Sequence, residues 1–343
     1  MQAVPASAAP LMAPHLNGSH TPPTFFNAGT EAKATPVVHP SAARWQQWQH
    51  LADSLEPLLT APTEVHDFLG NLQQMASKLH HLVLEDPDVG IFHLVFATGD
   101  KIRRYSLLHA MHTGMLLTLI GHRKEWGEPR TVLAIQAGLT MNLSIMALQV
   151  DLAQQQEPLS PEQRDLINEH PLRSRQMLAE LGVTHIDWLQ AVAEHHEQTD
   201  GKGYPLGLSQ VHPLADAIHT CDIFGAKLSP RVGRNSLLSP RAATEIFRQR
   251  SVGYFGATII RELGLYPPGC LVELASGEQA IVVRRMPDQN APDVVVLRDR
   301  DGTPMSPPIR SHTRRDSGRH IVSATMDQRW ASPEHLHDIL ALM

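Results

Sequence analysis

The sequence predicts a mainly α-helical protein: a helical bundle with an N-terminal helical segment and a small C-terminal β module. Two observations support this fold class. Apolar residues recur at spacings of three and four from residue 44 to about residue 265, which is the period of one face of an α-helix. Beyond residue 266 they alternate with a period of two and are separated by turn residues, as in short antiparallel strands.

The composition limits the class of protein. A chain of 343 residues with 42% hydrophobic residues can build two or three domains with real cores. The net charge of -6 gives no electrostatic footprint for DNA or RNA. The two cysteines form no disulfide framework, no apolar run is read as a membrane span, and the first residues do not resemble a secretory signal. We therefore expect a cytoplasmic protein without membrane association.

The N-terminal third divides into a tail and a helical segment. Residues 1–43 are rich in Ala, Pro, Thr and Ser and carry almost no charge, so we expect a disordered tail. Residues 44–86 show helical spacing on both sides of Pro62, which predicts a helical hairpin. This hairpin would pack on the next domain or form a homodimer.

Residues 87–265 are predicted to be almost entirely helical. Ser160, Pro161 and Gln163 form a helix start with a capping box. We expect that helix to end at His170, because Pro171 disfavours the α conformation in the residue before it. A further helix is then predicted from Pro171 to Leu181.

The remaining chain is predicted to form the β module, residues 266–325, and a C-terminal helix within residues 326–343. Cys270–Arg285 alternates like a strand pair, and Asp293–Arg298 is a Val-rich strand. A Ser-Pro-Glu sequence then starts a short amphipathic helix.

The most informative stretch runs from His195 to Leu208 and reads HHEQTDGKGYPLGL. Two adjacent imidazoles at the end of an apolar helix pattern can direct two neutral nitrogens to one point, which suits a borderline metal ion. The glycines permit positive φ or a close backbone approach, and Pro205 stiffens the end of the loop. Taken alone, two histidines at a helix end would more often be simply exposed to solvent.

The full stretch resembles the HHExxDGxGYP signature of the HD-GYP family, bacterial metal-dependent phosphodiesterases that cleave cyclic di-GMP. The resemblance covers roughly residues 100–265 and implies an HD-domain helical bundle. It implies three sets of site residues. The metal ligands would be His109, His170, His195, His196 and Asp222. The side chains that contact the substrate phosphates would be Arg231, Arg234 and Lys202. A partner loop able to contact diguanylate cyclase domains would comprise Asp200, Gly201, Gly203, Tyr204 and Pro205.

The sequence departs from the family where the adjacent His-Asp pair should stand. The aligned positions hold Met141 and Asn142, the family's lysine is Ile145, and the acidic residue one turn before the first-helix histidine is Tyr105. Two divalent ions repel strongly without anionic bridges, and a thioether and an amide do not supply them. We therefore expect no binuclear centre: one divalent ion (Fe, Mn or Zn) on His170, His195, His196 and Asp222, or none.

Three functions follow from this pattern, and no catalytic residue is assigned. The first is a cyclic di-GMP signalling protein with a degenerate metal site and weak or absent hydrolysis, acting by nucleotide binding or by partner docking. The second is an active phosphodiesterase with a rearranged mononuclear site, in which a nearby histidine such as His112 replaces a lost ligand. The third is a pure scaffold that dimerises through its N-terminal helices.

Overall fold

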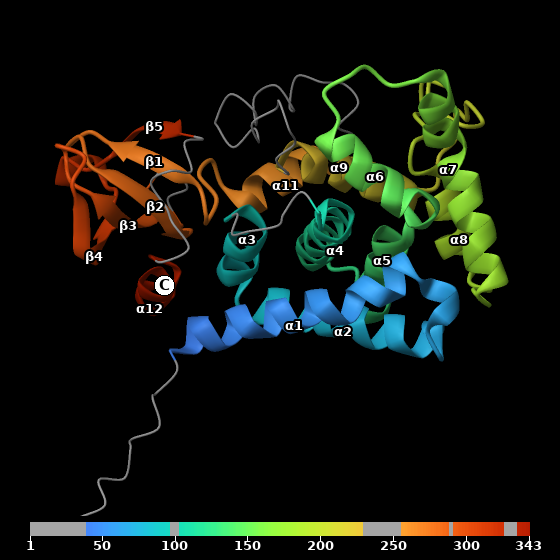
Figure 1. Ribbon diagram of the computed structural model, residues 1–343, viewed down its shortest axis with the longest axis horizontal. Helices are drawn as coiled ribbons and strands as arrows, with labels where there is room; N and C mark the ends of the chain where they lie inside the picture. Colours follow the sequence, from blue (N-terminus) through green and yellow to red (C-terminus); the bar gives the residue numbers. More distant parts are fainter. Residues whose placement is uncertain (1–38, 97–102, 229–254, 288–290, 326–334) are drawn as a thin grey trace, which may run out of the picture. The chain divides into compact units, whose positions relative to one another are not determined.

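The computed structural model describes residues 39–96, 103–228, 255–287, 291–325 and 335–343. All of them belong to one compact unit, Val38–Met343. Along the described chain, helices are followed by one antiparallel sheet and a short last helix (Figure 1). The predicted fold class, a helical bundle with a small C-terminal β module, is confirmed.

The described chain begins with two helices that pack against each other. They are α1 (Pro40–Thr60) and α2 (Phe68–Glu85), joined by the 3-10 turn η1 (Pro62–Glu64), and α3 (Pro87–Val95) follows. The start of α1, at Pro40, lies three residues before the expected end of the tail at residue 43. The reason is local, since Pro40 occupies the first turn and the His39 ring accepts a hydrogen bond from the amide of Ser41. The rest of the predicted tail lies outside the described residues.

The helical bundle is arranged around α4, which lies between several other helices in Figure 1. Its elements are α4 (Tyr105–Arg123), α5 (Glu128–Thr140), η2 (Leu143–Ile145), α6 (Met146–Gln154), α7 (Pro161–Glu180), α8 (Ile186–Glu194), α9 (Pro213–Leu228) and α11 (Gly256–Leu263). Because α2, α5, α6 and α9 all contact α4, nearly every side chain of α4 is buried. Polar residues on this helix, His109 and His112 among them, therefore lie in the interior.

The prediction that a helix ends at His170 is wrong. The helix α7 continues from Pro161 to Glu180 with Pro171 inside it. A proline inside a helix lacks the amide that would donate to the carbonyl four residues earlier, here Ile167. The His170 side chain compensates, because its Nδ1 lies 2.6 Å from the Ile167 carbonyl oxygen.

One stretch is apolar enough to cross a membrane by length and composition alone, contrary to the expectation from the sequence. It is Glu128–Gln154, with a mean hydropathy of 1.6 in its most apolar window. In the fold it comprises α5, η2 and α6, and 78% of that window is buried. Packing of α5 and α6 on α4 accounts for this apolar composition.

The β module is a five-stranded antiparallel sheet in the order β4-β3-β2-β1-β5. Its strands are β1 (Leu271–Leu274), β2 (Gln279–Arg284), β3 (Asp293–Arg298), β4 (Pro304–His312) and β5 (Ile321–Thr325). The inner strands β2 and β3 are the most buried, as their runs of valine predict. The last helix, α12 (Leu336–Leu342), contacts β4 and α1.

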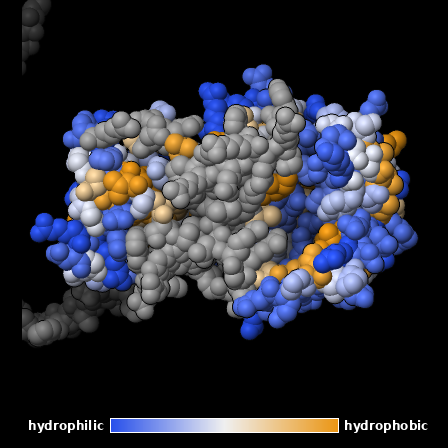
Figure 2. All heavy atoms as spheres, turned by 90° about the horizontal axis from the view of Figure 1, so that it is seen from above, coloured by the Kyte–Doolittle hydropathy of each residue, from blue (hydrophilic) through white to orange (hydrophobic). Residues whose placement is uncertain are grey.

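Exposed apolar side chains are scattered over the described surface. They are Leu84, Leu159, Leu166, Leu172, Ile186, Leu206, Ile309 and Val322. On the face drawn in Figure 2, outside the grey atoms, apolar groups form separate patches among hydrophilic ones. Single apolar residues at a surface are usual in folded proteins and need no partner to explain them.

A buried ion-pair network joins the N-terminal helices α1 and α3 to the sheet. Asp86, only 5% exposed, caps α3 by accepting the Val89 amide and binds the Arg284 guanidinium through both carboxylate oxygens, at 2.7 and 2.9 Å. Arg44 approaches the same carboxylate at 3.4 Å. The Asp86 carboxylate therefore links the start of α3 to α1 and to β2.

Replacing Asp86 should destabilise the protein. Asp86→Ala removes the cap of α3 and leaves the partly buried Arg284 with only the more distant Asp88 carboxylate, at 3.6 Å, so we expect the free energy of unfolding to fall by about 2–3 kcal/mol. Urea denaturation followed by circular dichroism measures this loss. The matched control is Asp53→Ala, which removes an ion pair of Arg104 with a carboxylate that is 64% exposed and should cost less than about 1 kcal/mol. Equal losses for the two variants would contradict the role given to Asp86.

Candidate metal centre

Three buried or half-buried histidines from two neighbouring elements converge on one point. His170 lies on α7, and His195 and His196 directly follow α8. Each offers a ring nitrogen, and these nitrogens all lie within 4.8 Å of one another. The Nε2 atoms of His170 and His195 are 3.1 Å apart. We call His170, His195 and His196 the histidine cluster.

Backbone carbonyls fix the tautomers of two members of this cluster. The His170 Nδ1 bonds the Ile167 carbonyl that Pro171 leaves free, and the His195 Nδ1 lies 2.7 Å from the Val192 carbonyl at the end of α8. A carbonyl can only accept, so both Nδ1 atoms carry the proton in the neutral rings. The two Nε2 atoms then face each other with lone pairs, an arrangement that a shared cation or proton stabilises.

Burial keeps the cluster neutral. Together with the neighbouring His170, burial lowers the pKa of His195 to about 3. Burial, followed by the charge of His195, also holds the pKa of His196 well below its usual value, and burial lowers the pKa of His170. Neutral imidazole is the form that binds metal ions.

The two other predicted ligands form a separate pair. His109 on α4 donates from Nε2 to Asp222 Oδ1 on α9 across 2.7 Å. Burial raises the pKa of the Asp222 carboxyl, but the hydrogen bond from His109 and the neighbouring imidazoles of His196 and His195 outweigh it and hold that pKa well below its usual range. Asp222 is therefore a carboxylate whose charge reaches the histidine cluster, while Oδ1 is already bonded to His109.

The His109 ring leaves one nitrogen unused. Its Nδ1 is buried and has no hydrogen-bond partner in the part of the chain that the structure describes. Gly225 permits this packing, since a Cβ at that position would lie only 3.3 Å from this nitrogen. The structure thus divides the five predicted metal ligands into a cluster of three imidazoles and a hydrogen-bonded pair, His109 and Asp222.

Glu197 holds the signature loop and does not join the histidine cluster. Its carboxylate is 2% exposed and accepts the backbone amides of Leu206 at 2.6 Å and Leu208 at 2.8 Å. Sequence reasoning left its direction open. The sequence offered no signal for this role, because Asp200 lies nearer to these amides in the chain than Glu197 does.

The loop packs directly against the histidine cluster. The Tyr204 ring stacks on His196 with ring centres 4.5 Å apart, and the Tyr204 amide donates to the His196 carbonyl at 3.2 Å. Gly203 is required here, since a Cβ would lie 2.4 Å from the backbone at Glu197 and Gln198. The other partner-loop residues, Asp200, Gly201 and Pro205, occupy the same turn.

The predicted phosphate contacts are only partly described. The Lys202 side chain is 81% exposed and lies 3.7 Å from Asp200 Oδ2, so its charge stands in water beside a carboxylate. Arg231 and Arg234 lie outside the described residues.

The positions aligned with the family's His-Asp pair follow the end of α5. Met141 is 1% exposed and belongs to the hydrophobic core, and Asn142 is 5% exposed. The next turn contacts α7 at the histidine cluster, because the Ser144 hydroxyl donates to the His170 carbonyl at 3.1 Å. Within the described residues, the ligand atoms that gather here come from three imidazoles, with no carboxylate among them.

Two further histidines lie near the site in different roles. His112, offered as a replacement ligand, has its Nε2 3.1 Å from the Leu94 carbonyl and is thereby directed toward α3. His219, which sequence reasoning missed, bonds the His195 carbonyl through Nδ1 at 2.8 Å, and its Nε2 is buried without a hydrogen-bond partner. Its position three residues before Asp222 on α9 was the available signal, since such residues share a helix face.

The low pKa of His195 predicts a loss of stability in acid for metal-free protein. The unfolded histidine, with a pKa of about 6.5, takes up a proton as the pH falls below that value, whereas folded His195 remains neutral until about pH 3. This group alone should lower the free energy of unfolding by about 2 kcal/mol at about pH 5, relative to neutral pH. Urea denaturation after chelation measures the loss, and His195→Gln, which cannot titrate, should show a smaller one. An equal loss in both proteins would contradict the buried neutral state.

Comparisons with known proteins agree with this geometry. Residues 103–259 match the family model of the HD domain. The chain is 26% identical over 209 residues to cyclic di-GMP phosphodiesterase PA4108 of Pseudomonas aeruginosa, covering 59% of this chain and 49% of that protein. It is 20% identical over 184 residues to cyclic di-GMP phosphodiesterase PdeB of Borreliella burgdorferi, covering 52% and 48%. The chain thus spans about half the length of the curated relatives it matches.

A solved structure shows the same fold. Bd1817, an HDG"Y"P protein from Bdellovibrio bacteriovorus, superposes with a TM-score of 0.50 at 17% identity, covering 60% of this chain and 66% of that one. The HD-domain match, the two phosphodiesterase relatives and this shared fold agree with the signature that begins at His195. Residues 103–259 therefore belong to the HD-domain family, and the chain is similar to HD-GYP proteins.

Proposed function

We propose that this protein is a cyclic di-GMP signalling protein of the HD-GYP type with a degenerate metal site, and that it hydrolyses the nucleotide weakly or not at all. One observation carries the proposal. Among the described residues, the histidine cluster is neutral and gathers three imidazoles with no carboxylate in the group, and Met141 and Asn142 stand where the family places its His-Asp pair. The substrate class rests on the two phosphodiesterase relatives.

Electrostatics supports the loss of hydrolysis. Two doubly charged ions about 4 Å apart repel by about 17 kcal/mol at an effective dielectric constant of about 20. Anionic ligands must offset this repulsion. Near the histidine cluster, Asp222 is a carboxylate whose charge acts on the histidines, but its Oδ1 is already bonded to His109. A second ion would therefore be poorly stabilised.

One ion fits the residues that are present. His170, His195 and His196 would hold it through neutral ring nitrogens, with Asp222 supplying nearby negative charge. Three imidazoles suit Zn²⁺ well and also accept iron or manganese. When bound, such an ion supplies Lewis acidity and lowers the pKa of a coordinated water. The protein groups contribute the orientation, since the carbonyls of Ile167 and Val192 fix the rings of His170 and His195.

Signalling would then proceed by binding without turnover. We propose that Arg231, Arg234 and Lys202 contact nucleotide phosphates, and that the loop from Asp200 to Pro205 contacts a partner such as a diguanylate cyclase domain. The loop suits a docking role because Glu197 fixes its backbone from inside. Its next residue, Leu206, presents an apolar side chain that is 56% exposed.

A mononuclear phosphodiesterase is the second candidate function. The observation that favours it is the pair of Nε2 lone pairs facing each other across 3.1 Å between His170 and His195, which a single ion would stabilise. A metal-activated water at such an ion is a sufficient nucleophile for some hydrolyses. The two candidates differ in turnover, which can be measured directly.

Turnover of cyclic di-GMP separates these functions. We expect the native protein, supplied with manganese or iron(II), to convert the nucleotide no faster than His195→Ala, because the ligands for a second ion are missing. Liquid chromatography of the products measures the rate, and calorimetry measures nucleotide binding in the same samples. Turnover by the native protein that disappears in His195→Ala would contradict the proposal and establish the second candidate.

Restoring the family's His-Asp pair should increase the number of metal ions bound per chain. The double variant Met141→His plus Asn142→Asp adds one imidazole and one carboxylate beside the histidine cluster, and we expect it to bind about one more ion per chain than the native protein. Mass spectrometry of the metal content after gel filtration measures this gain. The matched control, Met141→Leu plus Asn142→Ala, adds no ligand and should show no gain. An unchanged metal content in the first variant would argue against an eroded binuclear centre.

A further inference from the structure

A second group of ligand atoms lies apart from the histidine cluster. It consists of His80 and His81 on α2 and Glu128, the first residue of α5, with their ligand atoms all within 4.8 Å of one another. We propose that these three residues bind a divalent transition-metal ion of the Zn²⁺ class, which would link α2 to α5. Two imidazoles and one carboxylate are a ligand set that Zn²⁺ uses, with water completing the shell.

His80 supplies the first argument. Its side chain is 7% exposed, and its Nδ1 is buried without a hydrogen-bond partner among the described residues. Buried polar atoms are nearly always bonded, so an orphan nitrogen on a ring that lies beside two other metal-binding groups calls for an explanation. Burial also lowers the pKa of His80, which keeps the ring in the neutral form that binds metal.

His81 supplies the second argument. Its Nδ1 lies 2.7 Å from the Ser77 carbonyl, so in the neutral ring this nitrogen carries the proton and Nε2 has the lone pair. That Nε2 lies 3.8 Å from Glu128 Oε1. In a tetrahedral zinc site two such ligand atoms are about 3.4 Å apart, given bond lengths of about 2.0–2.2 Å. Only a small adjustment of these two exposed side chains would bring their ligand atoms to that spacing.

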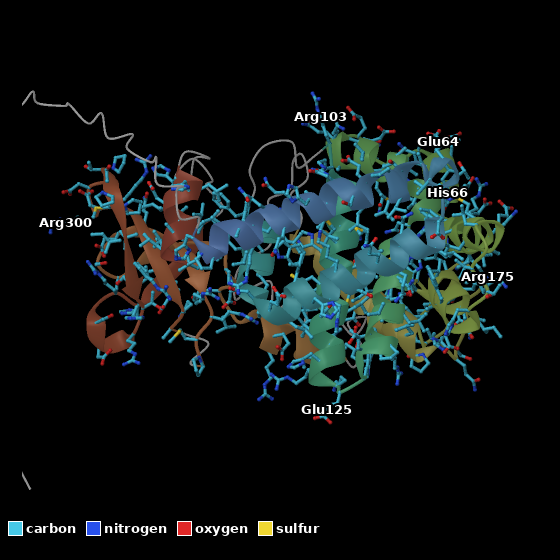
Figure 3. All side chains as sticks on the ribbon, turned by 90° about the horizontal axis from the view of Figure 1, so that it is seen from below. Glu64, His66, Arg103, Glu125, Arg175 and Arg300 are labelled. Atoms are coloured by element: carbon cyan, nitrogen blue, oxygen red, sulfur yellow. The ribbon has the colours of Figure 1, made fainter. Side chains whose placement is uncertain are left out.

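The exposure of the ligand side chains and their neighbouring residues fit a metal site that exchanges its ion with solvent. The side chains of His81 and Glu128 are 60% and 55% exposed, so an ion can reach them without opening the fold. A further imidazole, His122 at the end of α4, is close enough to act electrostatically on His80. The turn that connects α4 to α5 lies at the edge of the helical bundle, where Glu125 points outward in Figure 3.

The position gives the ion a structural consequence. The helices α2 and α5 contact each other, and both contact α4, which carries His109. An ion held by both would oppose their separation, and because it binds the folded state alone it would raise the melting temperature. This effect is independent of the histidine cluster, whose residues lie on α7 and after α8.

The test uses the full chain with the histidine cluster disabled. In the double variant His170→Ala plus His195→Ala, we expect zinc titration to show one ion per chain and a rise in melting temperature. Adding His81→Ala should weaken this binding at least tenfold and remove the rise, because the exposed Nε2 ligand is lost. The matched control adds Glu125→Gln, an exposed neighbour outside the ligand set, and should leave zinc binding unchanged.

Two results would overturn the proposal. One is the absence of zinc binding in the double variant, which would leave His81 and Glu128 as a surface ion pair. The other is equal zinc affinity with and without His81→Ala. If the double variant does not fold, the same comparison is made in the native background, where His81→Ala should lower the number of bound ions by one. Neither result depends on whether cyclic di-GMP is hydrolysed, so failure here and failure of the proposed function are distinguishable.

Discussion

The site depends on two hydrogen bonds from imidazoles to backbone carbonyls. They direct the Nε2 lone pairs of His170 and His195 toward each other across 3.1 Å in a region from which solvent is almost excluded. The carbonyl of Ile167 is free because Pro171 has no amide, and the carbonyl of Val192 is free because α8 ends two residues later. Irregularities of the backbone therefore create the ligand geometry.

The rest of the bundle supports this arrangement from both sides. Ser144 bonds the backbone of His170, His219 bonds the backbone of His195, and Tyr204 stacks on His196. Glu197 adds the loop that carries Tyr204, since it accepts two of the loop amides. The three imidazoles are positioned to bind one metal ion, but the negative charge that a second ion needs is depleted. This combination is the physical basis for proposing nucleotide binding without efficient hydrolysis.

Much of this could be predicted from the sequence, because the information is local. The helical period predicts the bundle, the period of two predicts the sheet, and the resemblance to the HD-GYP family predicts that His170, His195 and His196 gather. The predictions that failed depend on the direction of side chains and on contacts between residues distant in sequence. The predicted helix ended at His170 because the helix propensity of proline takes no account of the His170 ring. This ring bonds the carbonyl that is left free by the missing amide of Pro171. The pairing of His109 with Asp222 could not be foreseen, since it requires the packing of α4 against α9.

Anomalous X-ray diffraction from crystals soaked in manganese tests the central claim most directly, because it counts and locates the ions at the histidine cluster. The account predicts at most one peak there, within bonding distance of the His170, His195 and His196 ring nitrogens. Two well-occupied peaks about 3.5–4 Å apart at that cluster would contradict it, since such a centre requires the anionic bridges that this chain is argued to lack.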